Sequence, residues 1–287
     1  MTQSATPPAF VQCTAGVVEN VRIASHTYRI RLRAPELARR IRPGQFVMLR
    51  LRGSSDPLLG RPFALYDTVL DDLGEPVAID VVYLVVGKLT GLLAHVRAGE
   101  SVELWGPLGN GFPSYAGVDH VGLVAGGIGQ TPFLALVRQL LGSRGYGGCG
   151  PSRETKRVSL YYGVRTADFA AGVEDFRGAG ATVQLASDDG SVGFKGFVTD
   201  LLRSLTVLPD RLIGCGPAPM LAALALLARE WRTDCQVSLE TPMACGVGIC
   251  FSCVVPVCVP GGSDYRRVCI EGPVFDAEKI VWSGKVG

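Results

Sequence analysis

The first third of the chain alternates hydrophobic and polar residues over short stretches that turns separate. In residues 28–33, Tyr28, Ile30 and Leu32 alternate with three arginines, which is the pattern of a strand with one buried face. Comparable runs occupy residues 16–23, 45–51, 77–86 and 101–105. About six strands at this spacing predict a small antiparallel β-barrel over residues 10–113.

The pattern changes to alternating strands and helices over residues 118–233. Strands are predicted at residues 121–125, 157–162, 182–186 and 211–215, and helices at residues 132–141, 197–205 and 217–231. This alternation is typical of an α/β domain with a doubly wound parallel sheet. Residues 142–153 contain five glycines and predict a flexible surface loop.

A third pattern begins after Cys235, where the chain becomes rich in Cys and Gly and loses its periodicity. Five of the nine cysteines fall in the last 43 residues. We therefore expect a small third domain over residues 236–287, organised by a metal more than by a hydrophobic core.

Composition and charge exclude several classes of protein. A hydrophobic content of 47% excludes a disordered chain. The net charge of +2 argues against nucleic acid or an anionic membrane as the partner. The longest charge-free run, residues 241–263, holds four Cys, three Pro and four Gly, so it cannot span a bilayer. Residues 1–9 lack the features of a signal peptide, so a cytoplasmic location is expected, with cysteines that do not form disulfides.

The cysteine spacing of the tail is the strongest chemical signal. Cys245-x4-Cys250-x2-Cys253, followed by Cys269, has the x4/x2 spacing with which plant-type ferredoxins hold a [2Fe–2S] cluster. Cys258 is an alternative fourth ligand. A zinc site is the alternative reading of Cys250-x2-Cys253, although no second Cys-x2-Cys pair accompanies it.

Two turns follow predicted strands of the α/β domain and indicate a ligand crevice. The first is the glycine turn 126–132, in which we expect Thr131 to cap the following helix, and the second is 215–217. A helix N-terminus beside glycines suits a pyrophosphate. The nucleotide-contacting candidates are Gly126, Gly127, Gly129, Thr131, Gly216 and Pro217. Each turn could instead be an ordinary strand-to-helix connection, and Cys215 an ordinary small buried residue.

One segment of the predicted barrel combines a cation with an aromatic ring. Arg61 could pair with a phosphate while the ring of Phe63 covers a planar cofactor. The alternative is that Arg61 is a solvated charge and Phe63 is a core residue.

Taken together, these motifs resemble a known family. Residues 61–64, 106–112, 126–132, 162–165 and 215–217 are similar to the ferredoxin–NADP reductase superfamily. The segments 187–200, 238–253 and 267–276 narrow the resemblance to the electron transfer subunits of type B dihydroorotate dehydrogenases. The resemblance covers about residues 10–282.

The resemblance implies three parts: a β-barrel that holds FAD, an NAD-binding α/β domain and a [2Fe–2S] domain. Leu84 stands where the family usually has Arg, and Leu89 replaces a glycine of a Gly-x-Gly-Thr segment. The implied cluster ligands are Cys245, Cys250, Cys253 and Cys269. The implied flavin contacts are Arg61, Pro62, Phe63, Ala64, Val82, Tyr83, Leu84, Leu89, Thr90 and Gly91.

The resemblance also implies a function. Electrons from an FMN in a separate catalytic subunit would cross the cluster, collect on FAD and leave as hydride to NAD+, in pyrimidine biosynthesis. Cys215 would lie beside the reacting rings, and two such subunits would join two catalytic ones in a heterotetramer. NAD rather than NADP follows from the resemblance alone. The residues leave both open, since Arg165 could meet a 2′-phosphate and Asp168 could reject one.

Three alternatives remain open at this point. The chain could be an NAD(P)H-linked flavin and iron–sulfur subunit of another complex, such as a sulfide dehydrogenase-like or transhydrogenase-like assembly. It could be a stand-alone reductase that supplies an oxygenase or a ferredoxin. It could also be a zinc-bearing interaction protein.

Overall fold

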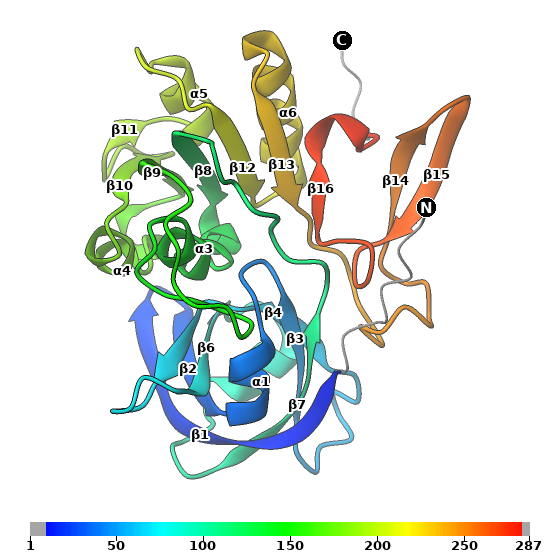
Figure 1. Cartoon of the computed structure of the whole chain (residues 1–287). Helices are drawn as coiled ribbons and strands as arrows, with labels where there is room; N and C mark the ends of the chain where they lie inside the picture. Colours follow the sequence, from blue (N-terminus) through cyan, green and yellow to red (C-terminus); the bar gives the residue numbers. More distant parts are fainter. Residues whose placement is uncertain (1–9, 283–287) are drawn as a thin grey trace.

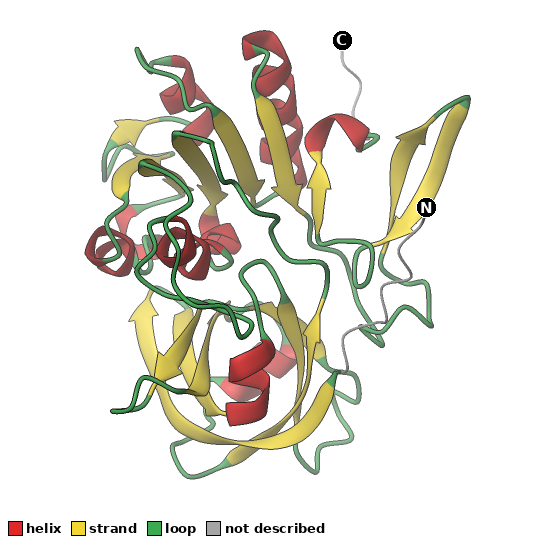
Figure 2. Ribbon diagram, in the orientation of Figure 1, coloured by secondary structure: helices red, strands yellow, loops and turns green. Residues whose placement is uncertain are grey.

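The computed structural model describes residues 10–282 of the 287-residue chain. The chain forms a curled sheet from its first third, a flat parallel sheet from its middle and a small hairpin from its tail (Figures 1 and 2). Residues 1–9, which entered the expectation about location, lie outside the described residues. Within the described part of the chain, no helix is both long and apolar enough to cross a membrane.

The first sheet is antiparallel and curls into a half-barrel, as the alternating pattern predicted. Its strands lie in the order β4-β3-β7-β1-β2-β6-β5, so the edge strands β4 and β5 are neighbours in sequence but are not paired. Ile30 and Leu32 point into its core. The elements are β1 (Val11–Ala24), β2 (Thr27–Arg33), α1 (Pro35–Arg40), β3 (Phe46–Leu51), β4 (Arg61–Ala64), β5 (Asp67–Leu70), β6 (Pro76–Leu84), α2 (Lys88–Leu93) and β7 (Ser101–Leu108).

The second sheet is doubly wound, in the order β11-β10-β9-β8-β12-β13-β16. Leu123 and Ala125 of its central strand β8 face the helices α3 and α4, whereas Val124 faces α5 and α6. This alternation explains why the strand is apolar on both faces. The elements are β8 (His120–Gly126), η1 (Gly127–Gln130), α3 (Phe133–Leu140), β9 (Arg157–Val164), η2 (Ala167–Phe169), α4 (Val173–Gly178), β10 (Thr182–Ser187), β11 (Phe194–Lys195), α5 (Val198–Arg203), β12 (Arg211–Cys215), α6 (Ala218–Trp231) and β13 (Asp234–Ser238).

The tail is attached to both sheets. Its hairpin consists of β14 (Val254–Val259) and β15 (Gly262–Arg267), and β16 (Val274–Asp276), followed by η3 (Ala277–Lys279), pairs antiparallel with β13. Buried tail residues pack in one cluster with Met48 of the half-barrel and Leu221 of α6. The tail therefore has a hydrophobic core that it shares with its neighbours, which the expectation of a metal-organised domain did not include.

The glycine-rich segment 142–153 also differs from the expected flexible loop. Tyr146 is 5% exposed and packs into the core of the half-barrel. Its hydroxyl donates a 2.6 Å hydrogen bond to Asp67, which also pairs with Arg138 and Arg144. One buried aromatic residue thus ties this segment to the neighbouring sheet.

Candidate cofactor crevice and iron–sulfur site

The two predicted turns meet at one edge of the parallel sheet. Strands β8 and β12 are neighbours, and Cys215 lies opposite Ala125 in the register. The residues that follow these strands line a cavity of about 830 Å³. Five predicted nucleotide contacts line it: Gly126, Gly127, Gly129, Gly216 and Pro217. The cavity therefore lies at the carboxyl ends of the strands, where open α/β sheets bind ligands.

Close backbone packing explains the glycines of this edge. A Cβ atom at Gly129 would collide with the carbonyl of Cys215. Gly216 has φ of +153° and approaches Gly126, whereas Gly127 has φ of +55° and open space where a side chain would stand. A turn without side chains beside open space at the start of a helix fits a pyrophosphate.

The predicted capping role of Thr131 is wrong. The short 3₁₀ helix η1 intervenes between β8 and α3, the N-cap of α3 is Pro132, and no side chain caps it. Thr131 instead lines a second cavity, at the junction with the half-barrel. The glycines of this turn thus line the first cavity, and Thr131 lines the second.

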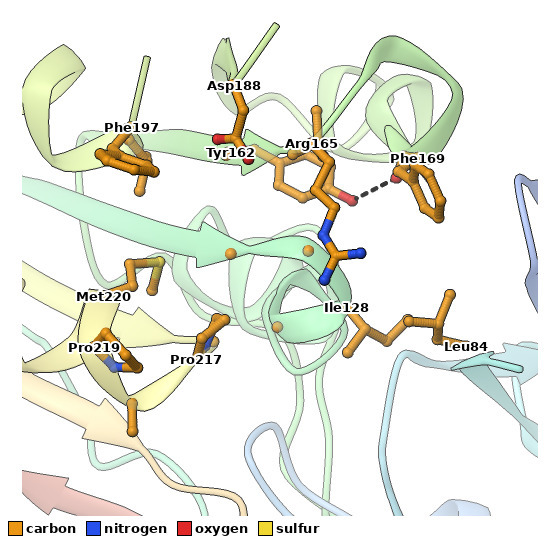
Figure 3. Close-up of a pocket in the computed structure, with 18 of the residues that line it drawn as sticks. Leu84, Ile128, Tyr162, Arg165, Phe169, Asp188, Phe197, Pro217, Pro219 and Met220 are labelled. Atoms are coloured by element: carbon orange, nitrogen blue, oxygen red, sulfur yellow. Dashed lines mark hydrogen bonds between the residues drawn. The ribbon is translucent and has the colours of Figure 1, made fainter. Parts of the chain in front are cut away.

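The far wall of the first cavity comes from β9, β10 and the residues after them (Figure 3). Arg165 points into the cavity from the end of β9, and Asp188 follows the neighbouring strand β10. The ring of Tyr162 lies beside Arg165, and its hydroxyl donates to the carbonyl of Phe169 at 3.2 Å. The acidic residue beside Arg165 in the cavity wall is Asp188, whereas Asp168 is not among the lining residues.

The second cavity, of about 560 Å³, lies between the half-barrel and the parallel sheet. Strands β4 and β6 and helix α2 supply one wall, and Cys215 and the segment 238–243 supply another. Nine of the ten predicted flavin contacts line it: Arg61, Pro62, Phe63, Ala64, Val82, Tyr83, Leu84, Leu89 and Thr90. Gly91 is not among the lining residues. The fold therefore joins segments that are far apart in the sequence.

The polar groups of this cavity suit a ligand with a polar edge. The Thr241 hydroxyl oxygen is buried in the wall and has no hydrogen-bond partner among the described residues. Such a buried group is costly unless a ligand satisfies it. Within residues 10–282, the Arg61 guanidinium donates only to the carbonyls of Leu59 and Gly60, at 3.1 and 3.0 Å, so it keeps further donors for a phosphate. These features fit FAD.

The segment in which Leu89 replaces a glycine is built around Thr90. The Thr90 hydroxyl accepts hydrogen bonds from the backbone N–H groups of Val86 and Gly87, both at 3.1 Å, and so caps α2. Leu89 is 3% exposed and packs in the core of the half-barrel. The glycine is thus replaced by a core residue that also lines the cavity.

The two cavities adjoin each other. Leu84, Val86, Ile128 and Glu240 line both of them. Cys215 lies in the wall near this junction, is 2% exposed, and has a thiol pKa raised by burial and by the charge of Glu240. A neutral thiol is a poor nucleophile, so the predicted role of Cys215 beside the reacting rings stays one of a small, neutral side chain.

The cysteines of the tail come together in two pairs. The Cys245 thiol is hydrogen-bonded with Cys250. Burial raises the pKa of Cys269, and its hydrogen bond with Cys253 and the charge of Cys245 raise that pKa further. Hydrogen bonding from Ser252 lowers the pKa of Cys250 to about 6, which favours the thiolate that binds metal. Among residues 10–282, no three His, Cys, Asp or Glu side chains surround a point as for a single metal ion. Two pairs of thiols match a cluster of two irons.

The surroundings of these cysteines fit a cluster between Cys250 and the buried pair. Cys253 and Cys269 are buried, whereas Cys250 is exposed. The backbone N–H of Val247 donates to the Cys245 thiol at 3.4 Å, as backbone groups do around cluster sulfurs. Cys258 is exposed on strand β14 of the hairpin, so the arrangement favours Cys269 over Cys258 as the fourth ligand.

Comparison with known proteins agrees with this geometry. Residues 240–281 match the model of the iron–sulfur cluster binding domain of dihydroorotate dehydrogenase B. A Bacillus caldolyticus protein, "Dihydroorotate dehydrogenase B (NAD(+)), electron transfer subunit", is 39% identical over 90% of this chain and 94% of its own. The protein of the same name from Caldanaerobacter subterraneus is 35% identical over 93% of this chain and 98% of its own.

Solved structures share the fold. A structure described as NADH-dependent reduced ferredoxin–NADP oxidoreductase is 29% identical, covers 93% of this chain and 90% of its own, and has a TM-score of 0.78. The ferredoxin reductase of carbazole 1,9a-dioxygenase, at 21% identity and a TM-score of 0.65, covers 79% of this chain and 68% of its own, and shows the fold alone. The chain thus belongs to the electron transfer subunits of NAD-linked dihydroorotate dehydrogenase B, which are flavin and iron–sulfur oxidoreductases of the ferredoxin reductase fold.

Proposed function

We propose that this chain passes electrons from a dihydroorotate-oxidising subunit to NAD+ through a [2Fe–2S] cluster and FAD. The observation that carries this proposal is that the three sites adjoin one another. The two cavities share four wall residues, and the cysteine loop begins two residues after Met243, which lines the second cavity. The cluster transfers single electrons, NAD+ accepts a hydride, and FAD converts between the two.

The chain's own residues hold the cofactors in this order. The glycine turns at Gly127 and Gly216 admit the NAD pyrophosphate, while Arg165 and Asp188 lie in the same cavity. The strand β4 and the Thr241 hydroxyl hold FAD at the junction of the two sheets. The four tail cysteines hold the irons. Residues 10–113 would form the FAD domain, 118–233 the NAD domain and 236–287 the cluster domain, with β13 completing the parallel sheet.

The cluster loop is fixed directly to the flavin-binding part of the molecule. The Trp105 indole of β7 donates to the carbonyl of Cys245 at 3.0 Å. Gly246 has φ of +72°, and a Cβ there would meet the side chain of Met48 in β3. Tight packing of the loop against β3 and β7 sets the position of a cluster relative to FAD.

The partner and its arrangement belong to the same proposal. We expect a catalytic subunit that contains FMN, two copies of each subunit, and a cytoplasmic assembly within pyrimidine biosynthesis. The transhydrogenase-like alternative also has one observation in its favour, which is the structural similarity to the NADH-dependent reduced ferredoxin–NADP oxidoreductase.

Reconstitution with a partner tests the proposal. The chain is co-expressed with the dihydroorotate-oxidising protein of its own organism, the complex is purified, and NADH formation is followed after dihydroorotate is added. We expect copurification, a flavin spectrum and one NADH for each orotate. A purified chain that binds FAD and iron, but joins a ferredoxin-linked partner and forms no NADH from dihydroorotate, would support the transhydrogenase-like alternative.

A further inference from the structure

One carboxyl group lies at the point where the two cavities meet. Glu240 follows β13 and lines both cavities, whereas the other shared wall residues, Leu84, Val86 and Ile128, are apolar. The side chain is open to the cavities, but protein encloses it on its other sides, and this burial raises the pKa of its carboxyl. Bound planar rings would exclude water from the same position and favour the neutral acid further.

No cation in the described structure holds Glu240 in its charged form. The flavin-side cavity is also lined by Arg61, Tyr83, Lys88 and Cys215, and the nucleotide-side cavity by Tyr162, Arg165 and Asp188. Burial is the one cause that shifts the pKa of Glu240. The Lys88 ammonium is paired with Asp56, and the Cys215 thiol is hydrogen-bonded with Ser238. Glu240 therefore keeps its proton to higher pH than a surface glutamate does.

The proposed reaction requires such a proton. The cluster delivers electrons without protons, so reduction of the flavin follows FAD + 2 e⁻ + H⁺ → FADH⁻. Hydride transfer then follows FADH⁻ + NAD⁺ → FAD + NADH, and the sum is NAD⁺ + 2 e⁻ + H⁺ → NADH. One proton must reach the flavin for each NADH, at a position from which both planar rings exclude water.

We propose that Glu240 supplies this proton, which its carboxyl group takes up from solvent through the open end of the cavity. The inference rests on the proposed function in one respect, namely that FAD occupies the second cavity. A role in proton supply explains why the Glu240 carboxyl group stands among apolar residues at the junction of the two cavities. A glutamate needed only for solubility would face the outer surface.

The test compares Glu240→Gln, which keeps the shape but cannot titrate, with the matched surface variant Glu278→Gln. The midpoint potential of bound FAD is measured against pH by spectroelectrochemistry. In the wild type and in E278Q, the plot of midpoint potential against pH should change its slope at the pH where Glu240 titrates. The reason is that the negative charge of the reduced flavin raises the affinity of a nearby carboxylate for protons. This change of slope should be absent in E240Q. Unchanged curves in all three proteins would overturn the proposal.

The kinetics give a second readout. Electron delivery through the cluster to NAD+ should fall about 100-fold in E240Q, in line with the usual effect of a positioned acid. Wild-type activity should be present at low pH and lost as pH rises through the pKa of Glu240, because the acid form is required. Glu240→Asp should restore part of the rate, and failure to do so despite normal flavin binding would contradict the proposal.

The two proposals fail in different ways. A wild-type protein that binds no flavin would refute the proposed function and this inference together. A protein that binds flavin, reduces NAD+ with its partner and shows no effect of E240Q would refute only the role of Glu240. The potential measurement needs no partner subunit, so it is independent of the partner's identity.

Discussion

At the scale of single residues, the role of a side chain depends on its neighbours as well as on its residue type. The five tail cysteines have the same side chain, yet Cys253 and Cys269 are buried beside each other while Cys258 is exposed on a hairpin strand. Thr90 lines the second cavity, as expected of a cofactor contact, but its hydroxyl also caps α2. The local sequence does not show which hydroxyl or thiol remains free, because the competing partners come from other segments.

Replacing single cysteines should distinguish the cluster ligands from cysteines that do not bind the cluster. Cys250→Ser removes one of the four proposed ligands, so we expect loss of the cluster's electron paramagnetic resonance signal and of partner-linked NAD reduction. Cys258→Ser should leave both intact, because that thiol lies apart on the hairpin. An unchanged signal in C250S, or a lost signal in C258S, would contradict the ligand assignment.

At the scale of elements, periodicity located the long segments and missed the short ones. The predicted helices 132–141 and 217–231 correspond to α3 (Phe133–Leu140) and α6 (Ala218–Trp231). The strands β4 and β16 contain only four and three residues, which is too few for a period to show. Such short strands form because longer neighbouring strands provide backbone hydrogen-bond partners. Those partners lie elsewhere in the sequence, so a local pattern does not reveal them.

The attachment of β16 provides a test at this scale. The Asn110 side chain donates to the carbonyl of Val274 at 2.8 Å and accepts from its N–H at 3.2 Å, and so fixes β16 beside the linker after β7. Asn110→Ala should lower the free energy of unfolding by about 1–2 kcal/mol. It should also speed hydrogen exchange at the Val274 amide.

Asn110→Asp is the matched control, because it keeps the acceptor for the Val274 N–H and loses the donor. We expect an intermediate loss of stability and nearly normal exchange at Val274. Equal effects of both substitutions would show that the side chain acts through charge or solvation and not through these two bonds.

At the scale of the whole molecule, the tail is secured in two ways. Residues such as Val257 and Ile280 pack in a core shared with the half-barrel and α6, and β16 pairs with β13. The loop between Cys245 and Cys253 has no regular secondary structure, so we expect bound metal to supply part of its order.

Removal of iron should therefore loosen only part of the tail. After chelation under reducing conditions, hydrogen exchange should rise across residues 245–253 and remain slow in β13 and β16. The α/β domain should keep its circular dichroism spectrum. Loss of protection throughout residues 236–282 would show instead that the cluster organises the entire tail.

The sequence by itself determined the local features: the alternation of the first sheet, the strand–helix order of the second, and the x4/x2 spacing of cysteines. These depend on residues that are near one another in the chain. Only the tertiary structure decided that Glu240 stands at the junction of two cavities, that Asp188 accompanies Arg165, and that Tyr146 is a core residue. The physical reason is that burial and cavity walls arise where distant segments pack, and no local pattern encodes which segments meet.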